Sequence, residues 1–232
     1  TVHHLRSYLM TLKKSGLQDS SLEGVRSVMS SFFGWLWKEN LIQSNPCGNL
    51  GTIKVQKKIR RPYSATDIEK LKKGCKNQRD RAVICFLLST GARISEVCAL
   101  DMSDVNFGQL ECTVLGKGNK ERTVYIDEVT AMELQNYLLT RKDSSLALFA
   151  GKGTKRMTAH GMRKMLTELS KRTGVENVHP HRFRRTLATN LIDHGMPIQE
   201  VAYILGHEKI DTTMKYIYID QTNVKHSYQR YS

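Results

Sequence analysis

Two separate segments of the sequence combine residues that could bind and attack a phosphate group. Arg184 follows His181 by three residues, so both side chains lie on one face at the start of a helix. Arg93 stands in a second segment far upstream. Guanidinium groups form paired hydrogen bonds with phosphate oxygens and stay charged at any working pH. The two arginines could therefore hold a phosphodiester and neutralise the charge that develops during attack, although a His-x-x-Arg pair alone is a common motif.

Cleavage of a phosphodiester by a side chain also needs a nucleophile and groups that transfer protons. The chain offers His207 after a Leu-Gly pair, and the tyrosines Tyr203, Tyr216 and Tyr218 lie around it. A free tyrosine has a pKa of about 10 and attacks poorly without a base. Spacing alone does not choose among these tyrosines, and most helical tyrosines are core or surface aromatics. The alternative for His207 is a helix cap after Gly206.

The run His-Pro-His181-Arg-Phe-Arg184-Arg-Thr-Leu-Ala-Thr, the Leu-Gly-His207 segment and the Thr-Gly-Ala-Arg93 segment together resemble the motifs of the tyrosine recombinase family, also called phage-type integrases. The family places its nucleophilic tyrosine nine residues after the histidine of Leu-Gly-His, which selects Tyr216 here. The resemblance implies that Arg93 and Arg184 clamp the scissile phosphate. It also implies that His181 accepts the tyrosine proton and that His207 hydrogen-bonds the phosphate.

Three further residues are interpreted through the same resemblance. Lys117, in the expected hairpin turn Gly116-Lys-Gly-Asn119, matches a lysine that protonates the leaving 5′-oxygen from the minor groove; otherwise it is a solvated hairpin lysine. Glu96 matches the acidic position that orients His181 or an arginine, and a simple salt bridge is the alternative. Arg185 stands where many members have histidine, which bears on local DNA or core contacts rather than on the chemistry.

The implied reaction is site-specific recombination of double-stranded DNA. Tyr216 would form a 3′-phosphotyrosyl link and free a 5′-hydroxyl, and the 5′-hydroxyl of a partner strand would then attack that link. Two such exchanges through a Holliday junction imply a tetramer on paired recombination sites, which accessory DNA-bending proteins could assist. No metal or other cofactor is expected, because arginines replace the cation of metal-dependent nucleases and the covalent link makes ATP unnecessary.

The biological role has several readings. Integration and excision of a mobile element is the first, and resolution of chromosome dimers by an Xer-type recombinase is the second. DNA relaxation of the type IB topoisomerase kind uses the same chemistry. A DNA-binding protein that keeps only the scaffold is a fourth reading, and the complete residue set argues against it.

Composition agrees with a nucleic-acid partner. The 232 residues carry a net charge of +14, which favours a polyanion, either nucleic acid or an anionic membrane surface. The sequence has no apolar run near the ~20 residues of a membrane span and no signal-peptide pattern. Its five cysteines are odd in number and lack metal-ligand spacing, which suits a reducing cytoplasm. We therefore expect a cytoplasmic, nucleoid-associated protein without a membrane partner.

Periodicity predicts a mainly α fold with a small antiparallel β-sheet. The expected strands span 110–115 and 122–126. One further helix should open at Ser64 with Asp67 as its capping partner, and a short one should begin at Arg93. The other expected helices span 2–14, 20–42, 81–90, 128–142, 158–173, 181–194, 197–205 and 211–220.

The resemblance implies two domains that clamp duplex DNA in a C shape. Residues 1–53 correspond to a helical, SAM-like core-binding domain, which we expect to be N-terminally truncated, and residues 64–232 to the catalytic domain. The basic linker 54–63 is either a solvated tether or a strap along DNA phosphates. The apolar stripe of helix 20–42 is expected to be core rather than a platform for bases. The candidate DNA-binding residues are Arg26, Lys54, Lys57, Lys58, Arg60, Arg61, Lys120 and Arg182.

Overall fold

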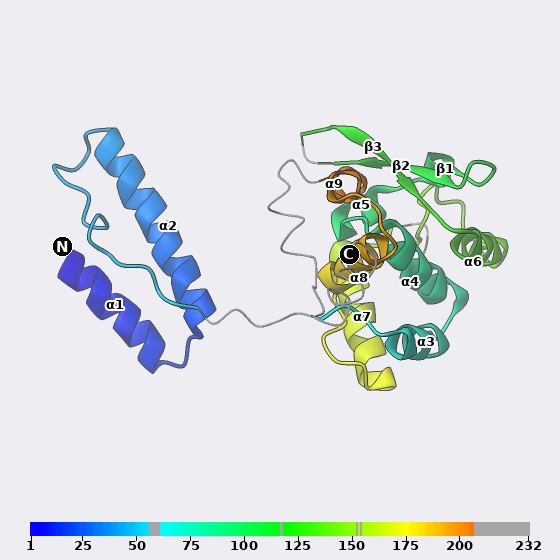
Figure 1. Ribbon diagram of the computed structural model, residues 1–232, viewed down its shortest axis with the longest axis horizontal. Coiled ribbons are helices and arrows are strands. Elements are labelled where there is room, and N and C mark those ends of the chain that lie inside the picture. Colours follow the sequence, from blue (N-terminus) through cyan, green and yellow to red (C-terminus); the bar gives the residue numbers. More distant parts are fainter. Residues whose placement is uncertain (56–60, 117, 152, 154, 207–232) are drawn as a thin grey trace, which may run out of the picture. The chain divides into compact units, whose positions relative to one another are not determined.

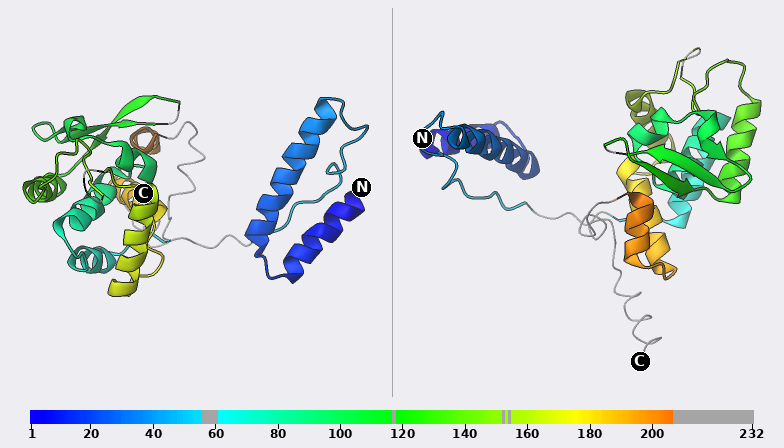
Figure 2. Two further views of the ribbon diagram at one scale, coloured as in Figure 1. Left: turned by 180° about the vertical axis from the view of Figure 1, so that it is seen from behind. Right: turned by 90° about the horizontal axis from the view of Figure 1, so that it is seen from above.

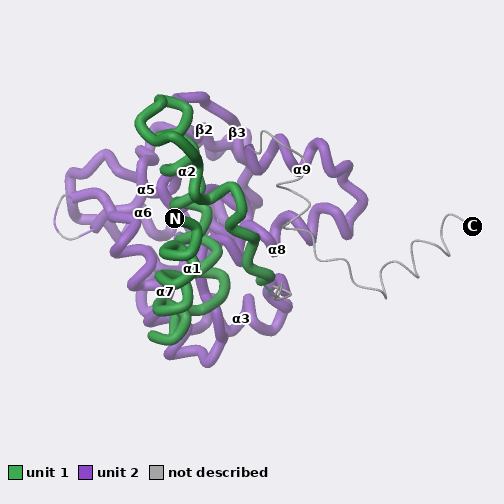
Figure 3. Tube along the Cα trace, turned by 90° about the vertical axis from the view of Figure 1, so that its left-hand side faces the viewer, with its two compact units in different colours: residues 1–59 green, residues 60–232 purple. Residues whose placement is uncertain are grey.

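The fold is mainly helical with one three-stranded antiparallel sheet, as the sequence predicts (Figure 1). The computed structural model describes residues 1–55, 61–116, 118–151, 153 and 155–206. The chain divides into two compact units, residues 1–59 and 60–232 (Figure 3). The division falls inside the predicted linker 54–63, and the assignment of the first unit to DNA binding stays a prediction.

The described part of the first unit contains two helices, α1 (Val2–Lys14) and α2 (Asp19–Lys38). The predicted end of α2 near residue 42 is wrong, because Asn40 adopts a left-handed conformation with φ 58°. The amide of Asn40 then bonds the carbonyl of Trp37 (3.1 Å) and the amide of Leu41 bonds that of Leu36 (2.9 Å). These two bonds are the Schellman pattern that ends a helix.

The core of the first unit is small. Its buried residues are Leu9, Leu22, Cys47 and Leu50. The prediction that the whole apolar stripe of α2 is core is wrong, since large side chains on it are half or more exposed: Val28 (70%), Phe32 (52%) and Trp37 (51%). Within the described residues α1 packs against α2 but leaves this side of the helix uncovered.

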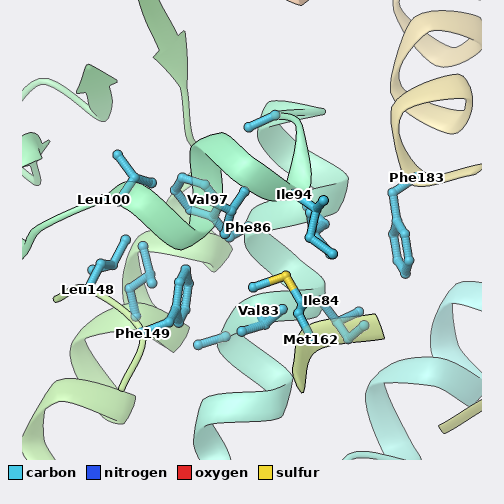
Figure 4. Packing of buried hydrophobic residues seen from close by; sticks show 14 of the residues in the cluster. Val83, Ile84, Phe86, Ile94, Val97, Leu100, Leu148, Phe149, Met162 and Phe183 are labelled. Atoms are coloured by element: carbon cyan, nitrogen blue, oxygen red, sulfur yellow. The ribbon is translucent and has the colours of Figure 1, made fainter. Parts of the chain in front are cut away.

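The second unit is built around α4 (Gln78–Thr90), whose middle is buried on all sides. Asn77 caps α4 by accepting from the amide of Asp80 (2.8 Å), so the helix starts three residues before the predicted 81. The preceding helix α3 (Ala65–Lys73) opens with the capping box between Ser64 and Asp67, which confirms that prediction. Figure 4 shows side chains of this core, among them Phe86 of α4 beside Phe149, with ring centroids 5.8 Å apart.

The sheet follows α5 (Ile94–Ala99) and a 3₁₀ turn at Met102–Asp104. Its strands are β1 (Val105–Asn106), β2 (Glu111–Leu115) and β3 (Glu121–Tyr125), in that order. β1 was not predicted, because two residues are too few to show an alternating pattern. In the β2–β3 register Val114 lies opposite Arg122 and Cys112 opposite Val124. Arg122 therefore lies on the sheet face that carries the buried Cys112, Val114 and Val124.

Four helices complete the described part of the second unit: α6 (Glu128–Leu139), α7 (Ala159–Thr173), α8 (Pro180–Asp193) and α9 (Ile198–Leu205). Their bounds lie within three residues of the predicted ones. α9 packs beside α8 (Figure 2). It buries Val201 and Leu205 against Ala188. The predicted helix 211–220 lies outside the described residues. None of the helices described is long and apolar enough to cross a membrane.

Candidate active site

The turn between α4 and α5 brings Arg93 to one end of the second unit. Gly91 ends α4 in the left-handed conformation (φ 56°), and Arg93 is the N-cap of α5. A Cβ at Gly91 would lie 3.0 Å from the side chains of Leu187 and Leu205, and its φ would also be strained. Glycine at this turn thus allows α8 and α9 to pack closely against it.

Arg184 extends from α8 to the same turn. Its side chain is buried, and its Nη1 donates to the carbonyl of Gly91 at 2.9 Å. Its Nη2 donates to the carbonyl of Leu205, at the end of α9. Arg93 Nη2 donates to the next carbonyl, that of Gly206, at 2.9 Å. Both guanidiniums therefore meet at the C-terminal end of α9, where the helix dipole favours positive charge.

Glu96 connects this end of the fold into one network. Its carboxylate is buried and accepts from the Arg93 amide (2.7 Å) and from Arg93 Nη1 (2.8 Å). It also accepts from Nη1 (2.8 Å) and Nη2 (2.9 Å) of Arg122. Burial alone would raise the pKa of Glu96, but the hydrogen bonds from Arg122 and Arg93 outweigh it and lower the pKa to about 2. Glu96 is predicted to orient either His181 or an arginine, and in the structure its side-chain partners are the arginines Arg93 and Arg122.

Arg122 is a site residue that sequence reasoning missed. It lies on β3 with its side chain 10% exposed, and its Nε donates to the carbonyl of Ile204 at 3.2 Å. The alternating pattern of the predicted strand 122–126 contained a signal for it, because Arg122 shares the inward-facing positions with Val124 and Ile126. A cation on the core face of a strand requires a buried partner.

Of the other predicted catalytic residues, the structure describes only His181. His181 is exposed in the first turn of α8, three residues before Arg184, and its ring lies 6.4 Å from that of His179. Lys117, His207 and Tyr216 lie outside the described residues. Their roles, like those of Arg93, His181 and Arg184, stay predictions.

The chain neighbours of Lys117 and His207 do lie at the network. A Cβ at Gly116 would be 3.5 Å from Arg122 Nη1 and 4.0 Å from Glu96 Oε1. The Gly206 carbonyl accepts from Arg93. The chain therefore reaches the network just before residue 117 and again just before residue 207.

The predicted DNA-binding residues fall into three groups: exposed ones, ones outside the described residues, and ones that make internal contacts. Lys54, Arg61 and Lys120 are exposed, whereas Lys57, Lys58 and Arg60 lie outside the described residues. Arg26 is partly buried instead, and two of its nitrogens bond the Glu23 carboxylate at 2.8 and 2.7 Å. The Glu23 carboxylate also accepts from the amide of Ile53 (2.9 Å), so Glu23 ties the segment at Ile53 to α2 and Arg26 balances its charge.

Arg182 also makes internal contacts. Its guanidinium lies 4.1 Å from the ring centre of Tyr63 and donates to the carbonyls of Arg61 (3.2 Å), Pro62 (3.2 Å) and Glu176 (2.6 Å). The structure thus shows Arg182 fastening the segment that enters the second unit to α8. Its predicted contact with DNA stays a prediction, and Arg185 is buried in the same helix.

The charge of the network suits a phosphodiester, which carries one negative charge and gains a second as the pentavalent transition state forms. Arg93, Arg122 and Arg184 carry three positive charges, and Glu96 carries one negative charge, so two positive charges remain. Arg93 is the most accessible of the three arginines, with its side chain 38% exposed. In the described part of the chain no three His, Cys, Asp or Glu side chains gather as metal ligands.

Comparisons with known proteins agree on one family. The profile of the phage integrase family matches residues 63–223. The chain is 32% identical to the tyrosine recombinase XerC of Leptospira interrogans, over 97% of the chain and 76% of that protein. It is 28% identical to the tyrosine recombinase XerD of Halalkalibacterium halodurans, over 97% of the chain and 79% of that protein.

Solved structures share the fold. The integrase of transposon Tn1549, bound to a circular intermediate DNA, superposes with a TM-score of 0.83 at 20% identity, over 100% of this chain and 85% of that one. The XerA recombinase superposes with a TM-score of 0.68 at 24% identity, over 100% of this chain and 83% of that one. The profile match covers more than half of the chain and includes Arg93, Glu96, His181, Arg184 and Tyr216. The chain therefore belongs to the phage integrase family of tyrosine recombinases, which are enzymes that cleave and rejoin DNA strands.

Proposed function

We propose that the protein integrates and excises a mobile element by site-specific recombination, with Tyr216 as nucleophile. The observation that carries the proposal is the meeting of Arg93 and Arg184 at the end of α9, next to residue 207. This meeting of two arginines that are 91 residues apart in the sequence supports a joint role for them in binding the phosphate.

In this mechanism Arg93 and Arg184 hold the non-bridging oxygens of the scissile phosphate. His181 accepts the proton of Tyr216 as its oxygen bonds to phosphorus, and Lys117 protonates the leaving 5′-oxygen. His207 donates to the phosphate and stabilises the charge of the pentavalent transition state. The products are a 3′-phosphotyrosyl link and a free 5′-hydroxyl, so the bond energy is retained and the mechanism requires neither ATP nor a metal ion.

Rejoining reverses these steps with the 5′-hydroxyl of a partner strand as nucleophile. Two rounds through a Holliday junction exchange both strands of two duplexes, which requires four protomers on paired sites. The first unit and the basic residues Lys54, Lys57, Lys58, Arg60 and Arg61 are proposed to hold the duplex. Neutralised phosphates would make binding strongly dependent on salt.

Covalent trapping on DNA tests the nucleophile. The substrate is a pool of duplexes with a randomised central segment and a nick in one strand, so that cleavage near the nick releases a short fragment and prevents rejoining. The full chain should form adducts that survive detergent, and their sequences define a substrate for later assays. Tyr216→Phe should form no adduct.

Tyr203→Phe is the matched control, because Tyr203 is a 70% exposed tyrosine in the last turn of α9, two residues before its end. It should trap DNA as well as the unchanged chain. Trapping by Tyr216→Phe, or its loss in Tyr203→Phe alone, would refute the assignment of the nucleophile.

Strand exchange separates recombination from DNA relaxation. Two duplexes that carry the selected site and different labels should yield recombinant products and Holliday junctions. A protein that only relaxes supercoiled plasmid in a type IB manner would produce neither.

Resolution of chromosome dimers is the second candidate function. It is favoured by the 32% identity to a XerC protein, which exceeds the 20% identity to the transposon integrase. Cells that express the protein should contain an excised circular element, detectable by amplification across its joined ends, if the first candidate is correct. Deletion of the gene should instead cause unresolved chromosome dimers and filamentous cells if the second is correct.

A further inference from the structure

We propose that Arg122 is a positioning residue of the phosphate site, acting through Glu96 and the end of α9 rather than by contact with DNA. This inference rests on the proposed function. It concerns how the charge and orientation of Arg93 are set, and it adds a residue from β3 to the network that Arg93 and Arg184 form with the end of α9.

The contacts of Arg122 reach each of these neighbours. Two nitrogens of its guanidinium bond both oxygens of Glu96, at 2.8 and 2.9 Å. The third, Nε, donates to the carbonyl of Ile204 in α9 at 3.2 Å. A Cβ at Gly206 would lie 2.9 Å from this Nε, so the guanidinium packs directly on the backbone at the end of the helix.

Glu96 has no hydrogen-bonding capacity to spare while Arg122 is in place. A carboxylate offers about four lone-pair sites. Oε1 accepts from Nη1 of Arg93 and Nη1 of Arg122, and Oε2 accepts from the Arg93 amide and Nη2 of Arg122. Arg122 therefore supplies half of the bonds that satisfy this buried carboxylate.

Loss of Arg122 would change the electrostatic state of Arg93. Two lone-pair sites of a buried carboxylate would be unfilled, which is costly, and Arg93 is the remaining cation in the described network that bonds to it. Arg93, which already bonds Glu96 at 2.8 Å, would then be its only counter-charge in the described network, so the carboxylate would cancel the charge of Arg93 and favour a turn of its guanidinium that fills the empty sites. A phosphate would meet a misplaced and largely neutralised partner.

The same loss would release the end of α9. Arg93 and Arg184 both donate to carbonyls there, and Arg122 holds the adjoining carbonyl of Ile204. The Gly116 backbone, at the end of β2, also lies against the guanidinium. A single side chain thus ties β2, β3, α5 and α9 together at the site.

Arg81 and Glu133 provide a matched control pair. Arg81 bonds Glu133 at 2.6 Å, and the side chain of Glu133 is 5% exposed against 3% for Glu96. This pair links α4 to α6 and makes no contact with the network of Arg93. Arg81→Met therefore removes an arginine partner from a similarly buried glutamate outside the site, although Arg81 is itself more exposed (38%) than Arg122 (10%).

The test measures the rate of adduct formation in a single turnover on the selected nicked substrate, at saturating protein. Each variant is assayed at a temperature where circular dichroism shows it folded. Arg122→Met should slow the reaction by about tenfold to a hundredfold, the range expected when a catalytic group is displaced by up to about 1 Å. The rate of adduct formation by Arg81→Met should stay within about twofold of that of the unchanged chain, because this substitution displaces no catalytic group.

Arg122→Lys keeps the charge but not the three-nitrogen fork, so its rate should also fall, by a smaller factor. It provides a second variant if Arg122→Met does not fold.

A double mutant separates positioning from a general loss of packing. If Arg122 acts through Glu96 as well as through α9, adding Arg122→Met to Glu96→Gln should slow the reaction by a clearly smaller factor than in the unchanged chain, because no uncompensated carboxylate is left and only the bond to the Ile204 carbonyl is lost. If Arg122→Met slowed the reaction by the same factor in the unchanged chain and in Glu96→Gln, the inference would be overturned and Arg122 would have a structural role only.

The outcomes also separate this inference from the proposed function. Full activity of both Arg122 variants, with Tyr216→Phe inactive, would refute the inference and leave the function standing. If the unchanged chain forms no adduct with any member of the pool, the proposed function fails and this inference fails with it.

Discussion

Replacement of Glu96 by glutamine should remove a contribution to stability whose size depends on pH in a defined way. Hydrogen bonds from Arg122 and Arg93 lower the pKa of the folded carboxyl to about 2, against 4.5 for the free group. A difference of about 2.5 pKa units corresponds to a contribution on the order of 3 kcal/mol to the free energy of unfolding at neutral pH.

The sign follows from the direction of the shift. The folded state binds the proton more weakly than the unfolded state, so this contribution is complete above pH 4.5 and is lost as the pH falls towards 2. By linkage, about half of it should be gone near pH 3. Glutamine has the same shape but does not titrate, so it keeps a constant stability term over this range.

The measurement is urea unfolding of the unchanged chain and of Glu96→Gln, followed by circular dichroism between pH 7 and pH 3. The difference in free energy between the two proteins isolates Glu96, because every other carboxyl is common to both. It should narrow by about 2 kcal/mol from pH 7 to pH 3. A difference that stays constant over this range would show that Glu96 is not held by the two arginines in solution.

Gly206→Ala should destabilise the protein more than Gly174→Ala. Both glycines are left-handed helix C-caps. A Cβ at Gly206 would lie 2.9 Å from Arg122, whereas a Cβ at Gly174 would have no atom within 4 Å. We expect about 1 kcal/mol for the control and more for Gly206, from thermal unfolding, and equal losses would contradict the packing described for Arg122. Arg182→Met should loosen the segment that enters the second unit and speed its proteolysis, without changing the salt dependence of DNA binding. If the slope of log affinity against log salt concentration instead became shallower by about one, Arg182 would contact a DNA phosphate. Cys112 should not react with maleimide at pH 7.5 until the protein is unfolded, because burial raises the pKa of its thiol to about 12, and rapid modification of the native protein would contradict that burial.

Local features were readable from the sequence where their cause is local. The capping box of Ser64 with Asp67, the turn at Gly91 and the cap of α7 at Thr158 arise from neighbouring residues, so the predicted bounds of these helices hold within a few residues. The Schellman end of α2 at Asn40 was equally local and was overlooked, because an apolar stripe continues past it to Ile42.

Burial depended on packing partners instead. Val28, Phe32 and Trp37 have the helical spacing of a core stripe, yet they are exposed because α1 covers a different side of α2. A periodic pattern shows that a helix has an apolar face; it does not show that another element covers it.

The sequence by itself determined the family and the residue types of the site, because Arg93, His181 and Arg184 stand in motifs whose order along the chain is diagnostic. Tertiary structure alone decided which groups meet. Arg93 donates to the carbonyl of Gly206, which is 113 positions away in the sequence. Arg184 donates to the carbonyl of Gly91, 93 positions away, and Arg122 donates to that of Ile204, 82 positions away. Contacts between such distant residues depend on how α5, α8, α9 and β3 pack against α4, and no periodicity within a single element records that packing.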